Sequence, residues 1–499
     1  MQPLRALAPL LALAMAALHS TDARPNIILF FPDEMRHDWV NNGTATDFLR
    51  TPNLDSIRQR GVKFNRAIAA SPICAPSRAC MAAGSNYEEV GVLTNKFNFP
   101  TNRLTTYFKL LRESGYHTMS VGKVDLNKKD ESEGFGWGTD GSLHAEEFGF
   151  SRMVNCNGVY AMGYMNDPYV EPYTRWLVQH NKSEEYLADV RSRVVERNES
   201  SVDGAYAGLD YVQTDPNPLP DDLFNDNWVA DNAVRLLSEA QADPAVNEWF
   251  LVVNWNGPHY PMSVTQSMWN SVQNRTFPQP VDYSGPLNAS QLNSIRGDYA
   301  ALIENIDRQV GRILSTVKDL DNTVIVFASD HGDMLGDRGR WKKSVPYAGA
   351  VQVPLMIAGN AVVNESQRGK TTDAGVSLID LAATFLEIGE VFSIPTQMSE
   401  AVSLKPILAG KTAPRRVVRS AYKGWRLWFD GRFKYITGFN DESTLYDLDT
   451  DPLERTNLLE ATDPVLLAHY ERIVQWLLGK GDAAQVDLLS SNGVTTAQH

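Results

Sequence analysis

Short apolar runs alternate with amphipathic segments along most of the chain. The runs at 26–31, 248–255 and 323–330 consist mainly of apolar residues, which is typical of strands buried on both faces of a parallel sheet. At 299–317, apolar residues recur with the spacing of one helix face. The alternation predicts an α/β fold in which helices sandwich a mostly parallel central sheet. The same patterns predict further helices at 51–61, 104–115, 221–240 and 376–389, and a strand at 117–122.

The character of the sequence changes near residue 410. Residues 417–439 have the pattern of short antiparallel strands, with Asp430-Gly431 as a hairpin turn. A final helix is predicted near 464–478. We therefore expect a main α/β domain at 24–410 and a smaller antiparallel-sheet subdomain at 411–499. Residues 126–220 are polar and irregular, and they support no prediction of elements.

The N-terminus has the pattern of a secretory signal peptide. Arg5 precedes an apolar run at 6–18, and small residues follow at 21–23. The run is short for a membrane span, and a buried N-terminal helix is the alternative. We expect a signal peptide at 1–23 and a mature chain in the secretory pathway, either secreted or lysosomal, with no later segment able to serve as a membrane anchor.

Charge and composition narrow the range of partners. The 499 residues carry a net charge of -14, which argues against nucleic acid or an anionic membrane as the main partner. An anionic substrate would need its cations concentrated locally. Six sequons are consistent with a glycosylated surface; they begin at Asn42, Asn181, Asn198, Asn274, Asn288 and Asn364.

Three cysteines are too few for a disulfide scaffold. Two of them, Cys80 and Cys156, leave two states open, a disulfide or two buried free thiols. The third, Cys74, begins the stretch Cys-Ala-Pro-Ser-Arg at a predicted helix start. There it would lie at the positive end of the helix dipole, and Arg78 would share its face one turn later. This arrangement places a nucleophile beside a cation that suits anions.

Polar residues also follow the buried strands. Asp33 and Glu34 end the first run, Asp330 and His331 end the third, and His259 follows the second. Ligands in open α/β sheets gather outside the carboxyl ends of strands, so we expect these residues to meet. Carboxylate oxygens suit Ca²⁺ or Mg²⁺ better than soft metals, and a bare thiol fits poorly among them.

Together these motifs resemble the sulfatase family. The signature "CAPSRACMAAG" is accompanied, in the family's order, by stretches similar to its other motifs. The resemblance extends from about residue 24 to 479, nearly the whole mature chain. Its motifs are "RPNIILFFPDE", "TPNLDSIRQRGVKFNRAIA", "GYHTMSVGKVD", "NGPHYP", "SDHGDMLGDRGRWKKSVPY" and "TLYDLDTDPLERTNL".

The resemblance implies a sulfuric ester hydrolase with a modified nucleophile. In the family this cysteine is oxidised to Cα-formylglycine in the endoplasmic reticulum. The resemblance therefore implies that Cys74 is modified in this way, and that the formylglycine-generating enzyme is a partner of the chain during its biosynthesis. One Ca²⁺ per chain is implied; its ligands would be Asp33, Glu34, modified Cys74, Asp330 and His331. The implied sulfate-binding and catalytic cations are Arg78, Lys123, His259 and Lys343. Glu34 stands where the family usually has Asp or Gln.

The chain departs from the common family pattern at Asp125, where a histidine is usual. Gly-Lys-x-Asp together with "SPIC-x-PSRA" resembles the arylsulfatase K branch. This resemblance implies a sulfated sugar as substrate, with 2-sulfated glucuronate of glycosaminoglycans as the candidate. We expect Asp125 to accept a proton during catalysis. The alternative function is a phosphoester or phosphonate monoester hydrolase on the same scaffold. A non-catalytic relative would have lost Cys74, Arg78 or a metal ligand, and this chain keeps them.

Overall fold

The computed structural model describes residues 24–44, 47–128, 140–163, 165, 167–193, 211–412 and 416–479. The expected signal peptide at 1–23 and the sequon at Asn198 lie outside this part of the chain. Within it, no helix has the length and apolar character needed to cross a membrane.

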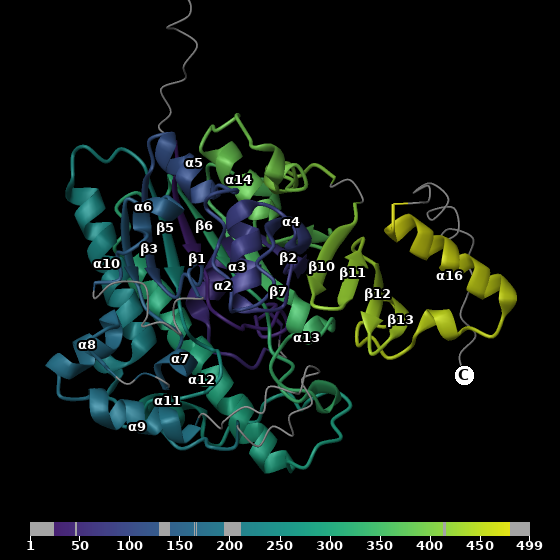
Figure 1. Cartoon of the computed structure of the whole chain (residues 1–499), viewed down its shortest axis with the longest axis horizontal. Coiled ribbons are helices and arrows are strands. Elements are labelled where there is room, and N and C mark those ends of the chain that lie inside the picture. Colours follow the sequence, from purple (N-terminus) through teal and green to yellow (C-terminus); the bar gives the residue numbers. More distant parts are fainter. Residues whose placement is uncertain are drawn as a thin grey trace, which may run out of the picture.

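A large, mostly parallel sheet forms the centre of the molecule (Figure 1), as predicted. Its strand order is β4-β3-β5-β1-β6-β7-β2-β8, and β9 also pairs with β2. The five strands from β4 to β6 run parallel, while β7 is antiparallel to both of its neighbours. The strands are β1 (Asn26–Phe30), β2 (Gly61–Ile68), β3 (His117–Gly122), β4 (Arg152–Asn155), β5 (Trp249–Asn254), β6 (Thr323–Ala328), β7 (Gln352–Ala358), β8 (Lys370–Thr372) and β9 (Val376–Ser377).

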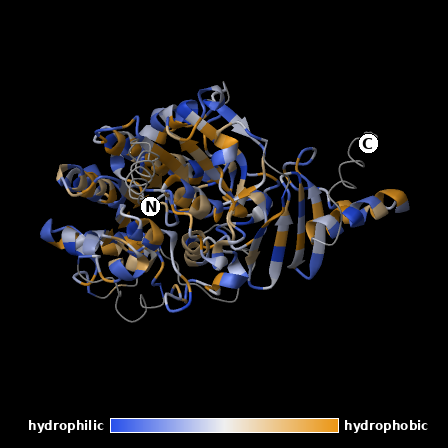
Figure 2. Cartoon of the chain, turned by 90° about the horizontal axis from the view of Figure 1, so that it is seen from above, coloured by the Kyte–Doolittle hydropathy of each residue, from blue (hydrophilic) through white to orange (hydrophobic). Residues whose placement is uncertain are grey.

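The central strands are apolar because both of their faces are covered. Along β1, Ile27 and Leu29 enter one hydrophobic core while Ile28 and Phe30 enter the other, as the two-residue period of a strand requires. The first core is covered by α3 (Cys74–Ala83), α5 (Tyr107–Glu113) and α14 (Asp380–Ile388). The second is covered by α2 (Pro52–Arg60), α10 (Asn225–Ala242) and α12 (Ala289–Leu314). Figure 2 shows the apolar residues gathered in this interior.

The predicted elements are found near their expected positions, with two differences. The helix predicted at 376–389 begins only at Asp380, because Val376 and Ser377 pair with β2 as β9. The helix predicted at 299–317 begins ten residues earlier, because Asn288 and Gln291 form a capping box at its start. The segment 126–220, which gave no prediction, contributes an edge strand of the sheet and several short helices. They are β4, α6 (Ala145–Phe148), α7 (Val159–Gly163), α8 (Pro172–Gln179) and α9 (Ser183–Arg193). The other short helices are α4 (Tyr87–Val90), α11 (Gln266–Val272), α13 (Ala348–Val351) and α15 (Lys405–Leu408).

A separate antiparallel sheet follows, as the sequence predicted. Its strands are β10 (Val418–Tyr422), β11 (Trp425–Phe429), β12 (Phe433–Phe439) and β13 (Glu442–Asp447), and α16 (Pro464–Leu477) ends the described chain. The predicted hairpin at Asp430-Gly431 joins β11 to β12, and Asp430 accepts hydrogen bonds from the backbone of Arg432 and Phe433. Figure 1 shows this sheet beside the β2 side of the main sheet, with α16 beyond it.

Of the two states left open for Cys80 and Cys156, the structure has free thiols. Cys80 lies in the core covered by α3, and Cys156 lies in the core on the opposite face of the sheet. A disulfide between them is therefore excluded by the sheet itself.

The end of β3 approaches β5 very closely at Gly122. This glycine has φ +88, and a Cβ at this position would lie 1.9 Å from the carbonyl oxygen of Asn254. No side chain fits between the two strands here. Gly122 thus sets the backbone that presents Lys123, the next residue.

We expect Gly122→Ala to lower the melting temperature far more than Gly91→Ala does. Both glycines have positive φ, but the nearest atom to a Cβ at Gly91 is the flexible Arg103 side chain, at 3.3 Å. In the Gly91 variant the positive φ should lower the free energy of unfolding by only about 1–2 kcal/mol. The Gly122 variant must also displace the backbone of β5. Thermal unfolding of the two proteins would test this, and equal melting temperatures would contradict it.

Candidate active site

The candidate active site lies at the carboxyl edge of the parallel strands. Because β3, β5, β1 and β6 are neighbours and parallel, the residues that follow them meet at one edge of the sheet. Lys123 follows β3 directly and His259 follows β5 after a turn, while Asp33 and Glu34 follow β1 and Asp330 and His331 follow β6. The expectation that these strand ends meet is confirmed.

The helix α3 brings Cys74 to this edge. The helix begins at Cys74, and every residue in it is buried, so the positive end of its dipole acts in surroundings with little solvent. The hydroxyl of Ser77 donates to the carbonyl of Asp330 at 2.6 Å. This bond ties the start of the helix to the end of β6 and places Cys74 against the acidic residues there.

Two carboxylates, a histidine and Cys74 form one compact cluster. One ligand atom from each of Asp33, Cys74, Asp330 and His331 lies within 4.8 Å of the others. The Sγ atom of Cys74 is 3.3 Å from Nε2 of His331 and 3.7 Å from a carboxylate oxygen of Asp33. All four residues are almost completely buried, so their charges depend on one another.

The donor set of this cluster fits a divalent cation. Burial lowers the pKa of His331, but the anionic neighbours Asp330 and Cys74 outweigh it and raise the pKa to about 9. The carboxylates that favour a proton on His331 would equally favour a metal ion, whose imidazole ligand must be deprotonated. Glu34 adds one buried oxygen, Oε1, that has no hydrogen-bond partner in the described chain.

Lysines surround the sulfur atom of Cys74. Nζ of Lys123 lies 3.6 Å from Sγ and Nζ of Lys343 lies 3.4 Å from it. Burial and Asp33 raise the pKa of the Cys74 thiol, but Lys123, Lys343 and His331 outweigh them and lower it to about 5. The site therefore favours a negative charge at residue 74.

Arg78 lies between the two carboxylates. Its Nε donates to Asp330 at 2.8 Å, and its Nη2 donates to Asp33 at 3.5 Å. The guanidinium also stacks on the ring of Phe31, with its carbon 4.9 Å from the ring centre. These contacts hold Arg78 beside Cys74, as the helical spacing predicted.

Glu34 and His259 form a second group that shares Asp33 with the first. Oε2 of Glu34 accepts from Nζ of Lys343 at 2.7 Å and lies 3.1 Å from Nε2 of His259. Burial raises the pKa of Glu34 to about 8, while burial together with Lys343 and Lys123 lowers the pKa of His259 well below its ordinary value. Burial thus favours the uncharged form of both side chains.

The loop that carries Lys343 presents this lysine to the site and turns its neighbour away. Lys342 lies with its Nζ 4.3 Å from the centre of the Tyr260 ring. Both Lys342 and Ser344 have positive φ, and the carbonyl of Ser344 accepts a hydrogen bond from the indole of Trp425, a residue of the C-terminal sheet. The two sheets thus cooperate in placing Lys343.

Asp125 is connected to the site through Lys123. Among the hydrogen bonds of the described residues, none joins Asp125 to Cys74. One oxygen of Asp125 lies 3.4 Å from Nζ of Lys123 and 2.8 Å from Nζ of Lys128. Burial raises the pKa of Asp125, but the two lysines and Arg78 outweigh it and lower the pKa to about 2. Asp125 is therefore ionised and is a weak base.

Comparison with known proteins agrees with this geometry. The sulfatase family model matches residues 25–391, which include every one of the site residues named above. The chain belongs to the sulfatase family. Its relatives include a choline-sulfatase of Rhizobium meliloti, 28% identical over 93% of this chain and 89% of the relative. Another is arylsulfatase K of Xenopus laevis, 26% identical over 82% and 74%.

Solved structures show the same fold. A phosphonate monoester hydrolase of Agrobacterium radiobacter matches with a TM-score of 0.69 and 21% identity, over 92% of this chain and 96% of that one. A protein in complex with its substrate D-glucosamine-2-N,6-O-disulfate matches with a TM-score of 0.68 and 19% identity, over 93% and 98%. Family membership makes this sulfatase a sulfuric ester hydrolase.

Two buried residues of this sulfatase site were not predicted from the sequence. Asp226 in α10 accepts hydrogen bonds from the backbone of Asn256 and Gly257 and so supports the turn that leads to His259. Asn254 ends β5 and contacts Arg78 at 3.0 Å. A signal for Asn254 was present, since it is a polar residue at the end of a buried strand, like Asp33 and Asp330. Nothing in the pattern around Asp226 distinguishes it from an ordinary helix residue.

Proposed function

We propose that this sulfatase removes sulfate from a sulfated sugar, with formylglycine at position 74 and one Ca²⁺. The observation that carries the proposal is the positive electrostatic environment of residue 74. Cys74 begins a buried helix, and Lys123, Lys343 and His331 lower the pKa of its thiol despite complete burial. A site that favours a negative charge at this position suits an oxygen nucleophile and a bound sulfate group.

The cationic side chains of the site would contact the sulfate group of the substrate. Lys123 and Lys343 lie within 4 Å of Sγ of Cys74, which here stands in for the oxygen atoms of the modified residue. Both lysines therefore face the position where a sulfate sulfur would be attacked. Together with Arg78 and His259 they would offset the charge that develops on the sulfuryl oxygens.

Asp33, Asp330 and His331 would hold Ca²⁺ together with the modified residue 74 and Glu34. Their oxygens are hard ligands, which suit this ion, and the unpartnered Oε1 of Glu34 supports its inclusion. The ion would supply positive charge that favours ionisation of the nucleophile.

Hydrated formylglycine would supply the hydroxyl that attacks sulfur. The leaving sugar alcohol needs a proton, and His259 or Lys343, which both lie against Oε2 of Glu34, would provide it. Asp125 keeps Lys123 charged and in position through its ion pair. The proton-acceptor role expected for Asp125 stays a prediction, and its low pKa favours the ion-pair role.

The substrate proposal rests on motifs and relatives. Gly122-Lys123-x-Asp125 resembles the arylsulfatase K branch, and arylsulfatase K is among the relatives. Another relative is named an N-acetylglucosamine-6-O-sulfatase. We therefore propose a sulfated sugar, with 2-sulfated glucuronate as the specific candidate. The alternative is phosphonate or phosphate monoester hydrolysis, because sulfate and phosphate are both tetrahedral oxyanions and the fold does not separate them.

A secretory location is also part of the proposal. All five sequon asparagines in the described chain are exposed, as glycosylation requires; they are Asn42, Asn181, Asn274, Asn288 and Asn364. Either secretion or delivery to a lysosome agrees with this surface.

We expect the purified protein to hydrolyse a chromogenic sulfate ester faster than the matched phosphate and phosphonate esters. The active protein should show, by peptide mass, loss of the thiol sulfur at residue 74 and gain of an aldehyde. Cys74→Ala should lower kcat/KM by about 1,000-fold or more because it removes the nucleophile. Preference for the phosphonate ester would favour the alternative function, and an unmodified thiol in fully active protein would end the formylglycine proposal.

We expect Asp330→Asn to abolish binding of Ca²⁺, because it removes one of two carboxylates from the cluster. Metal content after dialysis and calorimetric titration of the chelator-treated protein with Ca²⁺ would measure this. Asp337→Asn is the matched control, since Asp337 is a buried carboxylate that pairs with Arg36 and Arg296 instead. Normal calcium binding by the Asp330 variant would contradict the proposed ligand set.

We expect Asp125→Asn to raise KM for the sulfate ester by about 10-fold, with a smaller change in kcat, because Lys123 loses a counter-ion that holds it in place. Rapid mixing with a chromogenic ester would distinguish the two roles. A burst of alcohol release followed by a slow steady state would mean that the later release of sulfate from the enzyme has slowed. That result would assign Asp125 as the proton acceptor in that step, contrary to the ion-pair role.

A further inference from the structure

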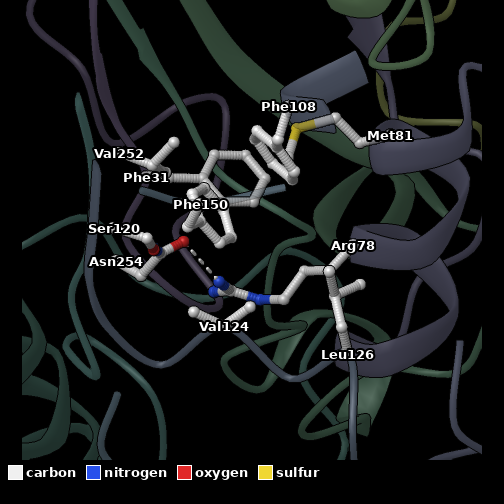
Figure 3. A pocket seen from close by; sticks show the side chains of 10 residues that line it. All are labelled: Phe31, Arg78, Met81, Phe108, Ser120, Val124, Leu126, Phe150, Val252 and Asn254. Atoms are coloured by element: carbon white, nitrogen blue, oxygen red, sulfur yellow. Dashed lines mark hydrogen bonds between the residues drawn. The ribbon is translucent and has the colours of Figure 1, made fainter. Parts of the chain in front are cut away.

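A small cavity lies behind the guanidinium of Arg78 (Figure 3). Its walls are mostly apolar and include the rings of Phe31, Phe108 and Phe150. Besides Arg78 itself, its polar lining residues are Ser120 and Asn254. Figure 3 shows the side chain of Asn254 directed at the guanidinium, on the side of the cavity away from Met81. A charged group with such a wall behind it must find its partners in the protein.

The partners of Arg78 account for nearly all of its donors. Nε donates once to Asp330, Nη1 donates to the carbonyl of Lys123 at 2.6 Å and to Oδ1 of Asn254 at 3.0 Å, and Nη2 donates once to Asp33. A guanidinium has five N–H groups. Four are thus bonded within the described chain, and the fifth, on Nη2, remains for a ligand.

Asn254 occupies a special place among these partners. Asp33 and Asp330 are the carboxylates of the metal cluster, and the carbonyl of Lys123 is backbone. Asn254 is the neutral side chain of the set, and it is itself held by bonds from Nδ2 to Ser120 Oγ at 3.1 Å and to the carbonyl of Val121 at 3.2 Å. Its amide therefore cannot rotate without breaking bonds to β3.

Asn254 also joins three of the segments that carry site residues. Its side chain contacts Arg78 on α3. Its carbonyl accepts from the backbone N–H of Lys123 at 3.0 Å. Its own strand, β5, continues into the turn that carries His259. One residue is thus bonded to the helix of the nucleophile and to the backbone of one sulfate-facing lysine.

We propose that Asn254 is a positioning residue for sulfate binding. It fixes the plane of the Arg78 guanidinium so that the fifth N–H, on Nη2, points at the sulfate group. The inference rests on the sulfate-binding role proposed above for Arg78. Because Asn254 acts through Arg78, its removal should weaken sulfate binding only when an arginine is present at position 78.

A different explanation is that Asn254 serves only to join β3 to β5. Its bonds to Ser120 and Val121 would then matter, and its bond to Arg78 would be incidental. Loss of Asn254 would lower stability in this case, with the same effect on sulfate binding whatever residue stands at position 78. A double-mutant cycle separates the two explanations.

The experiment compares wild type, Asn254→Ala, Arg78→Lys and the double variant. For each, kcat/KM with a chromogenic sulfate ester and the dissociation constant of inorganic sulfate are measured. We expect Asn254→Ala to weaken sulfate binding and lower kcat/KM by about 10-fold in the wild-type background. Lysine has no Nη1 to bond to Asn254, so in the Arg78→Lys background the loss should be at most about 2-fold.

Equal losses in both backgrounds would overturn the role of Asn254 while leaving that of Arg78 intact. If Arg78→Lys alone changes neither sulfate binding nor kcat/KM, the proposed role of Arg78 itself is wrong. The matched control is Val252→Ala, which removes side-chain volume from the same strand and cavity without removing a hydrogen bond of Arg78. It should lower the melting temperature and leave sulfate affinity unchanged; a loss equal to that of Asn254→Ala would assign the effect to packing and overturn the proposal.

Asn254→Asp gives a second measurement if the alanine variant fails to fold. A carboxylate keeps an acceptor for Nη1 but adds a negative charge beside Arg78, where sulfate would bind, and loses the donors to Ser120 and Val121. We expect weaker binding of inorganic sulfate, by about 10-fold, in the arginine background and a smaller change with lysine at position 78. Unchanged sulfate binding in Asn254→Asp would overturn the proposal.

Discussion

The burial of two carboxylates at one sheet edge is the constraint on which the rest of this structure depends. Asp33 and Asp330 are fully removed from solvent, and buried charges persist only when they are paired and hydrogen-bonded. Arg78 contacts both of them, and Lys123 pairs with Asp33. The cations that compensate the carboxylates are thereby fixed beside Cys74. The same ion pairs that make burial tolerable also assemble a site for an anion.

Much of the architecture can be understood as a means of holding those charges. The start of α3 is bonded to the end of β6, and the close approach of β3 to β5 at Gly122 determines where Lys123 begins. The C-terminal sheet contributes through the bond from Trp425 to the loop of Lys343. A small antiparallel sheet far along the sequence thus takes part in placing a residue next to the nucleophile.

The local patterns predicted the central strands, the main helices and the C-terminal hairpin because burial on both faces, helical periodicity and turn chemistry are readable within a few residues. The site residues on strand ends were predictable for a related reason, since parallel strands bring their carboxyl ends to one edge. The family motifs then implied Lys343, and the geometry agrees: Lys343 contacts Cys74, while its neighbour Lys342 lies against Tyr260.

The sequence by itself determined the fold class, the position of Cys74 at a helix start and the set of charged residues that surround it. Only the tertiary structure decided which distant partner each charge takes: Glu34 with Lys343 and His259, and Arg78 with Asn254. It also showed that Cys80 and Cys156 lie on opposite faces of the sheet. The physical reason is that periodicity and turn signals act between neighbours in the chain, whereas ion pairs and pKa shifts depend on distances between segments hundreds of residues apart.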